Sequence, residues 1–182
     1  KVDVIISEIL SAELVGEGVR YSILDAKRRL LKDGGKMIPQ SGAIKIALIC
    51  QNEEINNKTS VQKIKDYDLS AFNNLRADKF SLHLNQKPKL LSDAIKAFEI
   101  DFQNYFELQN IEKILKIKAN SNGVCIGLIQ WLDLNIYGDI KYENTPGVIN
   151  SHWPTPIYLF KNHVELNEGQ VLKVRASLFE DS

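Results

Sequence analysis

Between residues 43 and 179 the chain repeatedly places short apolar segments, several of them alternating apolar and polar residues, between polar turns. Alternation with a period of two puts one face of a strand in a core and leaves the other in solvent. The segments concerned are 43–50, 80–84, 97–102, 111–118, 124–137, 156–160 and 171–179. Many short strands are typical of a β-sandwich or β-barrel. We therefore predict a mainly β protein of the α+β class.

The first 38 residues follow a different pattern. Val2–Ile6 is apolar and β-branched, which is the composition of a strand buried on both faces of a parallel sheet. After a loop, apolar residues recur on one face of a helix that the glycine pair at 34–35 would end, ahead of Pro39. One strand and one helix form no stable sheet, so we expect this chain to be a fragment or its sheet to be completed by another chain. The alternative is a first strand that joins the later β-structure.

The composition limits the kinds of partner that we expect the protein to bind. The 23 basic and 23 acidic residues cancel, so no net charge attracts nucleic acid or an anionic membrane. No apolar segment approaches the length of a membrane span. Cys50 and Cys125 lie within apolar segments, which favours buried free thiols in a reducing compartment over a disulfide. We expect an intracellular, cytoplasmic protein, with the nucleus open if the organism is eukaryotic.

Glu8 and Glu17 are the first candidate site residues. They stand nine residues apart on the loop after the first strand, and Gly16 favours a turn between them. Ligands of α/β sheets bind at the carboxyl ends of the strands, where this loop begins. Two carboxylates that converge across a loop can hold a planar cation between them. The alternative is that both glutamates are merely solvated.

His152 and Trp153 form the second candidate. They lie between turn-forming residues and the prolines at 154 and 156, as a stiff loop of the kind that often carries function. The alternative is a histidine that caps a strand while the tryptophan packs inward. His83 and His163 are isolated and are expected to be structural or solvated. No spacing for zinc, no phosphate loop and no nucleophile elbow is present, so we expect no metal site.

The segment from Asp66 to Leu75 has apolar residues scattered among polar ones, too few for a core helix. An exposed apolar segment of this kind often docks on another subunit. Packing on its own domain is the alternative that this pattern leaves open.

Taken together, these motifs resemble those of the protein arginine methyltransferases. Residues 2–8 are similar to the strand that enters the family's double-glutamate loop, and Glu17 stands at the family's spacing. The segment 30–39 resembles the helix end and proline linker before the family's β-barrel, and 67–73 the start of its dimerisation arm. Ser151-His152-Trp153 matches its Thr-His-Trp loop. Where the commonest family loop has Trp-Met-Gly after its first glutamate, this chain has Ile9-Leu10-Ser11, and residues 13–18 look closer to the branch that stops at monomethylarginine.

The resemblance implies methyl transfer from S-adenosylmethionine to arginine in a protein substrate. By resemblance, residues 1–38 are the last part of a Rossmann-like cofactor domain, and 39–182 are a substrate-binding barrel with a dimerisation arm at about 62–88. Glu8 and Glu17 would bind the guanidinium, with His152 as a catalytic residue and Trp153 as a wall of the arginine channel.

Most of the cofactor site would lie upstream of Lys1, with Ser7 as a minor contact, so the chain alone is expected to be inactive. A homodimer through the arm is expected, and no nucleic acid or membrane partner. The alternative is an inactive β-rich interaction or dimerisation module.

Overall fold

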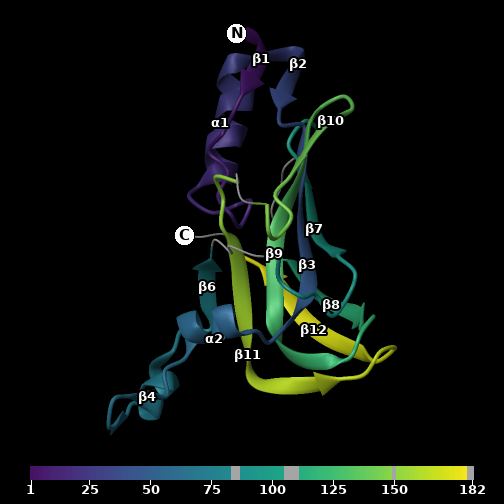
Figure 1. The fold of residues 1–182 in the computed structure, drawn as a ribbon. Coiled ribbons are helices and arrows are strands. Elements are labelled where there is room, and N and C mark those ends of the chain that lie inside the picture. Colours follow the sequence, from purple (N-terminus) through teal and green to yellow (C-terminus); the bar gives the residue numbers. More distant parts are fainter. Residues whose placement is uncertain (83–86, 105–110, 149–150, 180–182) are drawn as a thin grey trace.

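The computed structural model describes residues 1–82, 87–104, 111–148 and 151–179. It is mainly β, which confirms the predicted fold class. His83, expected to be structural, lies outside the described residues. The chain begins with strand β1 (Val2–Ile6), helix α1 (Val19–Leu30) and strand β2 (Leu31–Ile38). Figure 1 shows these three elements together at one end of the molecule.

Strand β2 was not predicted. We expected the helix to continue through Leu31 and to end at the glycine pair, but the helix ends at Leu30 and residues 31–38 are extended. Strand β2 pairs in parallel with β1, with Ile5 opposite Met37. The expected burial of β1 on both faces is also wrong for the described structure, because Val2, Val4 and Ile6 are 47%, 45% and 76% exposed.

The remaining strands confirm the predicted β-region. The central antiparallel sheet has the order β6-β11-β9-β3-β7, and β10 pairs with β9. Two further strands, β8 and β12, pair with each other along their whole length. The bounds are β3 Ser41–Cys50, β6 Lys79–Leu82, β7 Ile95–Asp101, β8 Ile111–Lys118, β9 Gly123–Tyr137, β10 Ile140–Glu143, β11 Thr155–Leu166 and β12 Val171–Leu178.

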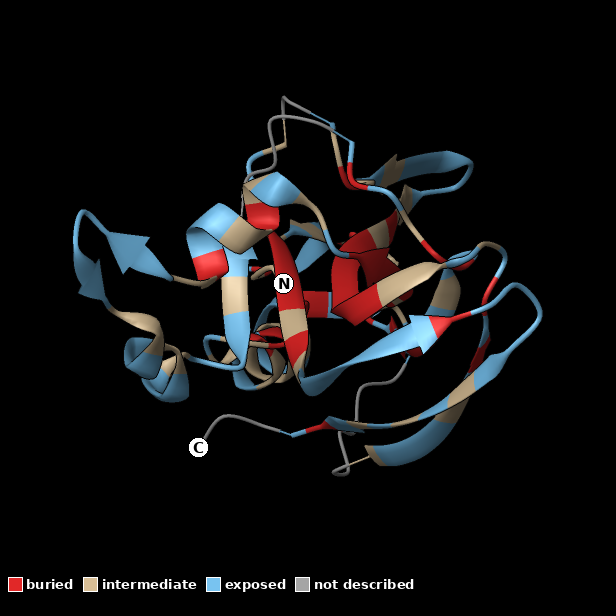
Figure 2. Cartoon of the chain, turned by 60° about the horizontal axis from the view of Figure 1, so that its bottom comes forward, coloured by how far each residue is buried: buried red, intermediate tan, exposed pale blue. Residues whose placement is uncertain are grey.

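The core lies between these strands. Figure 2 shows buried residues concentrated in the long central strands. Trp131 on β9 is 2% exposed and its indole nitrogen donates to Glu143 Oε1 at 2.7 Å. Cys50 and Cys125 are free and, as predicted, buried. They stand opposite each other on β3 and β9.

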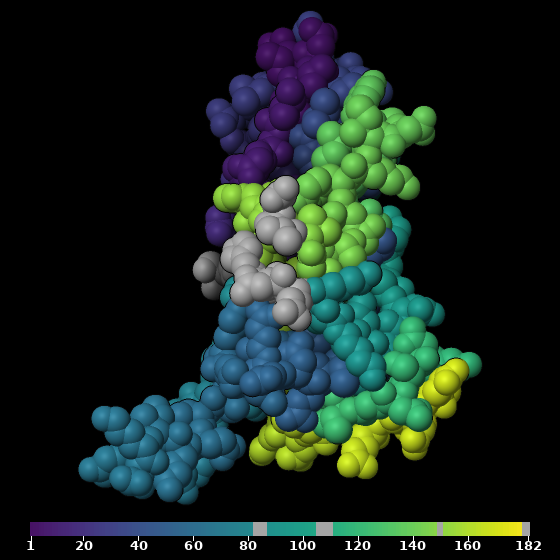
Figure 3. Space-filling view, in the orientation of Figure 1, coloured from purple at the N-terminus to yellow at the C-terminus, as the bar shows by residue number. Residues whose placement is uncertain are grey.

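Between β3 and β6 the chain leaves the body of the molecule. Helix α2 (Glu53–Thr59) is followed by β4 (Lys63–Ile64), β5 (Tyr67–Asp68) and the 3-10 helix η1 (Ser70–Leu75). No residue from Ser60 to Ser81 is buried. We refer to residues 60–78 as the arm, which projects from one corner of the molecule in Figure 3. Within the described chain, no helix combines the length and apolar character needed to cross a bilayer.

Gln103, just after β7, attaches the N-terminal unit to the large sheet. Its side-chain oxygen accepts from Met37 N at 2.9 Å, and its side-chain nitrogen donates to Gly35 O at 3.0 Å. Lys27 of α1 donates to the carbonyls of Phe102 and Gln103 at 3.1 and 3.0 Å. The loop that carries the glutamates is thereby held close to the end of the sheet.

Candidate functional site

The loop of residues 7–18, between β1 and α1, is wound tightly. Ser7 N continues the ladder by donating to Ile38 O at 2.8 Å, and Leu14 N closes a turn on Ser11 O at 2.9 Å. Leu14, Glu17 and Gly18 have positive φ angles of 69°, 62° and 70°. This conformation costs a non-glycine residue about 1–2 kcal/mol.

Burial of Leu14 offsets that cost. Its side chain is fully buried, and burial of a leucine side chain is worth about 1.5–3 kcal/mol. Gly42 on β3 makes the space, since a Cβ atom there would stand 2.7 Å from Leu14 Cδ1. The turn is therefore held by the core of the barrel and not by its own sequence.

Three polar contacts from separate strands or loops also hold the 7–18 loop. Gln130 Nε2 on β9 donates to Ala12 O at 3.0 Å. Trp153 Nε1 donates to Leu10 O at 2.9 Å. Lys79 at the start of β6 forms an ion pair with Glu13. The contact from Trp153 brings together the two candidate site segments, which are more than a hundred residues apart in the sequence.

Glu8 and Glu17 lie near opposite ends of this loop, and both are exposed. Glu8 follows the end of β1, and Glu17 directly precedes Gly18, the residue that caps α1. Within the described ranges, neither carboxylate has a hydrogen bond or an ion pair. Both are therefore available to an external cation, while the loop that carries them is fixed to the barrel.

The His152-Trp153 segment is organised around the indole. The Trp153 ring meets Tyr142 edge-on, with ring centres 5.7 Å apart, and Trp153 O accepts from Ser151 Oγ at 2.9 Å. Trp153 is half-buried, whereas His152 is exposed with its ring 6.0 Å from the indole. No hydrogen bond ties the His152 imidazole to another described residue, so its catalytic role stays a prediction.

Known proteins that are similar in sequence or structure agree on one family. No protein-family model matches the chain. An arginine N(omega)-methyltransferase from Streptomyces achromogenes subsp. streptozoticus is 28% identical over 176 residues, which are 96% of this chain and 48% of that protein. Protein arginine N-methyltransferase 1.6 from Arabidopsis thaliana is 28% identical over 203 residues, covering 97% of this chain and 28% of that protein. The chain is related to the protein arginine methyltransferases.

The fold has a counterpart among solved structures. A solved Trypanosoma brucei PRMT1 enzyme-prozyme heterotetrameric complex with AdoHcy matches with a TM-score of 0.80 at 19% identity, over 96% of this chain and 57% of that chain. At that identity the match shows the shared fold. The chain spans about half or less of the length of the two methyltransferases named above.

The sequence analysis missed one feature beside the 7–18 loop. A cavity of about 540 Å³ lies beside the loop, and its lining includes Glu13, Lys79, Gln130 and Tyr158. Burial raises the pKa of Tyr158 above its ordinary value, and Lys79 sits 5.9 Å from the centre of its ring. Gln130 could have been noticed in the sequence, because it is a polar residue inside an apolar strand. A buried polar side chain in such a strand needs a hydrogen-bond partner.

In the part of the chain that the structure describes, no group of three or more His, Cys, Asp or Glu side chains could hold a metal ion. Ser7 is half-buried at the end of β1, and its contact with a cofactor stays a prediction.

Proposed function

We propose that the protein containing this chain is a protein arginine N-methyltransferase that uses S-adenosylmethionine. The observation that carries the proposal is the hydrogen bond from Trp153 Nε1 to Leu10 O, which joins the His-Trp loop to the double-glutamate loop. The relatives named as arginine methyltransferases and the AdoHcy-bound neighbour support the same activity and cofactor.

The two glutamates suit an arginine substrate. A guanidinium ion is planar, stays charged at ordinary pH and presents five N–H donors, so two carboxylates can bind it with charge-assisted, bidentate hydrogen bonds. Glu8 and Glu17 would draw positive charge toward the nitrogens they bind and leave the target nitrogen more nucleophilic. When bound, the cofactor supplies an electrophilic sulfonium methyl group.

Positioning would contribute most of the rate, because the loop holds the target nitrogen in line for attack. The nitrogen gains the methyl group, the sulfur keeps the electron pair of the broken bond, and the nitrogen loses a proton. His152 is exposed beside the indole and would help that proton to leave. Trp153 would form a wall of the arginine channel, with its N–H already committed to the loop.

Replacement of each glutamate in the intact protein tests the assignment. Glu8→Gln and Glu17→Gln keep the shape of the side chain but remove the charge that matches guanidinium, so each should lower turnover at least a hundredfold, the cost of about 3 kcal/mol expected for a lost charged contact. Methyl transfer from labelled cofactor is measured to an arginine-rich peptide and, in parallel, to free L-arginine.

Glu165→Gln is the matched control, because Glu165 is an exposed glutamate on β11. It should leave turnover unchanged. Near-normal turnover in both loop variants would overturn the proposed role of the glutamates. Transfer to free arginine but not to the peptide would overturn the protein substrate and keep the reaction.

We also infer that the arm forms a homodimer. Tyr67, Phe72 and Leu75 on the arm are 73%, 63% and 82% exposed, which is unusual for large apolar side chains so close together in the sequence. Phe72→Asp in the intact protein should halve the mass measured by light scattering. Ile140→Asp, at an exposed apolar residue on β10, should not. A dimer that survives Phe72→Asp would exclude the arm as its interface, and a dimer without methyl transfer would favour the inactive interaction module.

A further inference from the structure

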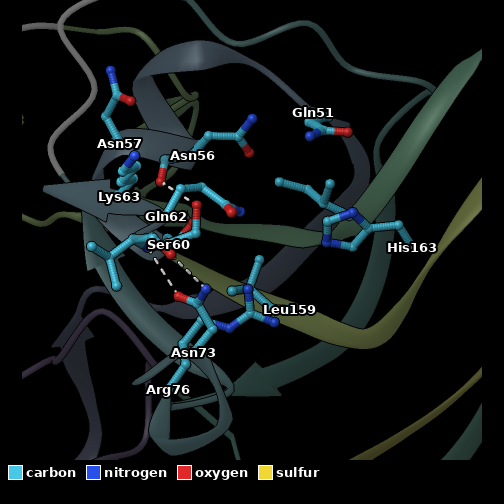
Figure 4. Close-up of a pocket in the computed structure, with 13 residues that line it drawn as sticks. Gln51, Asn56, Asn57, Ser60, Gln62, Lys63, Asn73, Arg76, Leu159 and His163 are labelled. Carbon is cyan, nitrogen blue, oxygen red and sulfur yellow. Dashed lines mark hydrogen bonds between the residues drawn. The ribbon is translucent and has the colours of Figure 1, made fainter. Parts of the chain in front are cut away.

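A second cavity lies where the arm joins the barrel. It has a volume of about 600 Å³, within the range of small-molecule sites. Its walls come from α2, residues near both ends of the arm, β9 and β11. Figure 4 shows the Asn56, Gln62, Arg76 and His163 side chains gathered around the same space.

The ionisable side chains of this cavity are all basic. Lys63, Arg76 and His163 line it, and none of its described lining residues is acidic. Some basic side chains elsewhere form ion pairs, such as Lys45–Asp133 at 3.0 Å and Lys96–Glu99 at 2.7 Å. Among the described residues Arg76 has no such partner, although it is half-buried. In a chain of zero net charge, this collection of unpaired basic groups favours an anionic ligand.

The backbone of β11 places His163 toward the cavity. Pairing between β11 and β9 is interrupted after Leu159, opposite Gly127, and resumes at Val164, opposite Cys125. Residues 160–163 therefore bulge from the ladder, which is a common way to redirect a side chain.

The wall formed by the arm is held in place by its own hydrogen bonds. Asn73 accepts from Val61 N at 2.9 Å and donates to Val61 O at 2.7 Å. Ser60 Oγ donates to Asn56 O at 2.9 Å. The side-chain amide groups of Asn56 and Gln62, by contrast, have no hydrogen-bond partner in the described part of the chain. They are free to bind hydroxyl or carbonyl groups of a ligand.

We propose that this cavity binds a phosphorylated small molecule with a hydroxyl-bearing body, such as a sugar phosphate. Arg76 is the main phosphate contact, because a guanidinium binds phosphate oxygens in a bidentate manner. Lys63 and His163 add positive charge, and the amides of Asn56 and Gln62 bind the hydroxyl groups. Inorganic phosphate alone would fill only a small part of the cavity. Since the lining joins the arm to β11, a bound ligand also stiffens the base of the arm.

Titration calorimetry on the full-length protein tests this site with ribose 5-phosphate as the probe. Ribose and inorganic phosphate serve as comparison ligands, and both should bind at least tenfold more weakly than the probe. Arg76→Gln should weaken the probe by about tenfold to a hundredfold, the loss expected for a charged hydrogen bond. Lys58→Gln is the matched control, because Lys58 lies on α2 outside the lining and pairs with Glu54. It should leave the affinity unchanged.

Gln62→Ala is a second test in case Arg76→Gln impairs folding. Gln62 is exposed and contributes only its side-chain amide to the cavity, so its replacement should not affect folding. It should weaken the probe and leave the affinity for inorganic phosphate unchanged. Absence of binding at millimolar ribose 5-phosphate would overturn the proposal, as would equal binding of ribose. An unchanged affinity in both Arg76→Gln and Gln62→Ala would show that the probe binds elsewhere and would also overturn it.

Discussion

Trp153→Phe is the sharpest probe of how the barrel positions the glutamate loop. The substitution keeps an aromatic ring beside Tyr142 but removes the N–H that donates to Leu10 O at 2.9 Å. Leu10 is 5% exposed, so its carbonyl would lose its partner in a place that water reaches poorly. The cost of an unsatisfied buried acceptor is about 1–3 kcal/mol.

That cost falls on one local equilibrium, the docking of residues 7–18 on the barrel. Since 1.4 kcal/mol is a factor of ten, the undocked population should rise about fivefold to more than a hundredfold. Hydrogen exchange of the full-length protein measures it, because the amide of Leu14 is protected by its bond to Ser11 O only while the turn is closed. The exchange rate of that amide should rise by the same factor.

Trp131→Phe is the control for a general loss of stability. It removes a similar indole hydrogen bond, to Glu143 Oε1, but inside the barrel. It should lower the free energy of global unfolding and leave the relative protection of the loop unchanged. If loop protection in Trp153→Phe equals that of the wild type, the indole contact does not hold the loop, and the observation that carries the proposed function is lost.

Two further predictions concern the support of the site. Asn144 is 2% exposed and accepts from the buried Leu132 N at 2.7 Å, so Asn144→Ala should lower the free energy of unfolding by about 1–3 kcal/mol in urea titrations; no change would mean that another group satisfies Leu132 N. Burial raises the pKa of Asp101, but hydrogen bonds from Asn104 at 2.8 Å outweigh it, and the net pKa lies below the ordinary value. Its stabilising contribution is therefore present above about pH 4 and is lost as the pH falls through the lower, folded-state pKa. The advantage of the wild type over Asp101→Asn in urea should shrink between pH 5 and 3, and a constant difference would contradict this assignment.

The strands with clear alternation could be predicted almost to the residue. Segment 111–118 is β8 as predicted. Ile111, Leu115 and Ile117 lie on its more buried face, whereas the lysines at 116 and 118 are exposed. Helix α2 was overlooked although its start had a signal: Asn52 caps it by accepting from Ile55 N at 2.7 Å, and Glu53 and Glu54 fill its first turn. Few apolar residues follow, so periodicity alone did not reveal it.

Strand β2 could not be predicted from the sequence, for a different reason. Its sequence, Leu-Lys-Asp-Gly-Gly-Lys-Met-Ile, lacks β-branched residues before Ile38 and contains a glycine pair that is typical of a helix end. It is extended because β1 pairs with it and because Gln103 bonds its backbone at Gly35 and Met37. These partners come from elsewhere in the chain, so local sequence propensity cannot reveal them. The same is true of the packing of Leu14 against Gly42.

The sequence allowed the glutamate loop and the His-Trp loop to be identified as candidates. It did not reveal that they lie in contact. Gln130 and Trp153 both bind the loop through main-chain carbonyls, those of Ala12 and Leu10. A carbonyl acceptor is present whatever side chain the residue carries. The loop can therefore depart from the Trp-Met-Gly of the commonest family members, with Ile9-Leu10-Ser11 in its place, and still be held in the same way. Variation in this stretch is free to alter the shape of the proposed arginine pocket, and with it the product of the proposed reaction, without releasing Glu8 and Glu17 from the barrel.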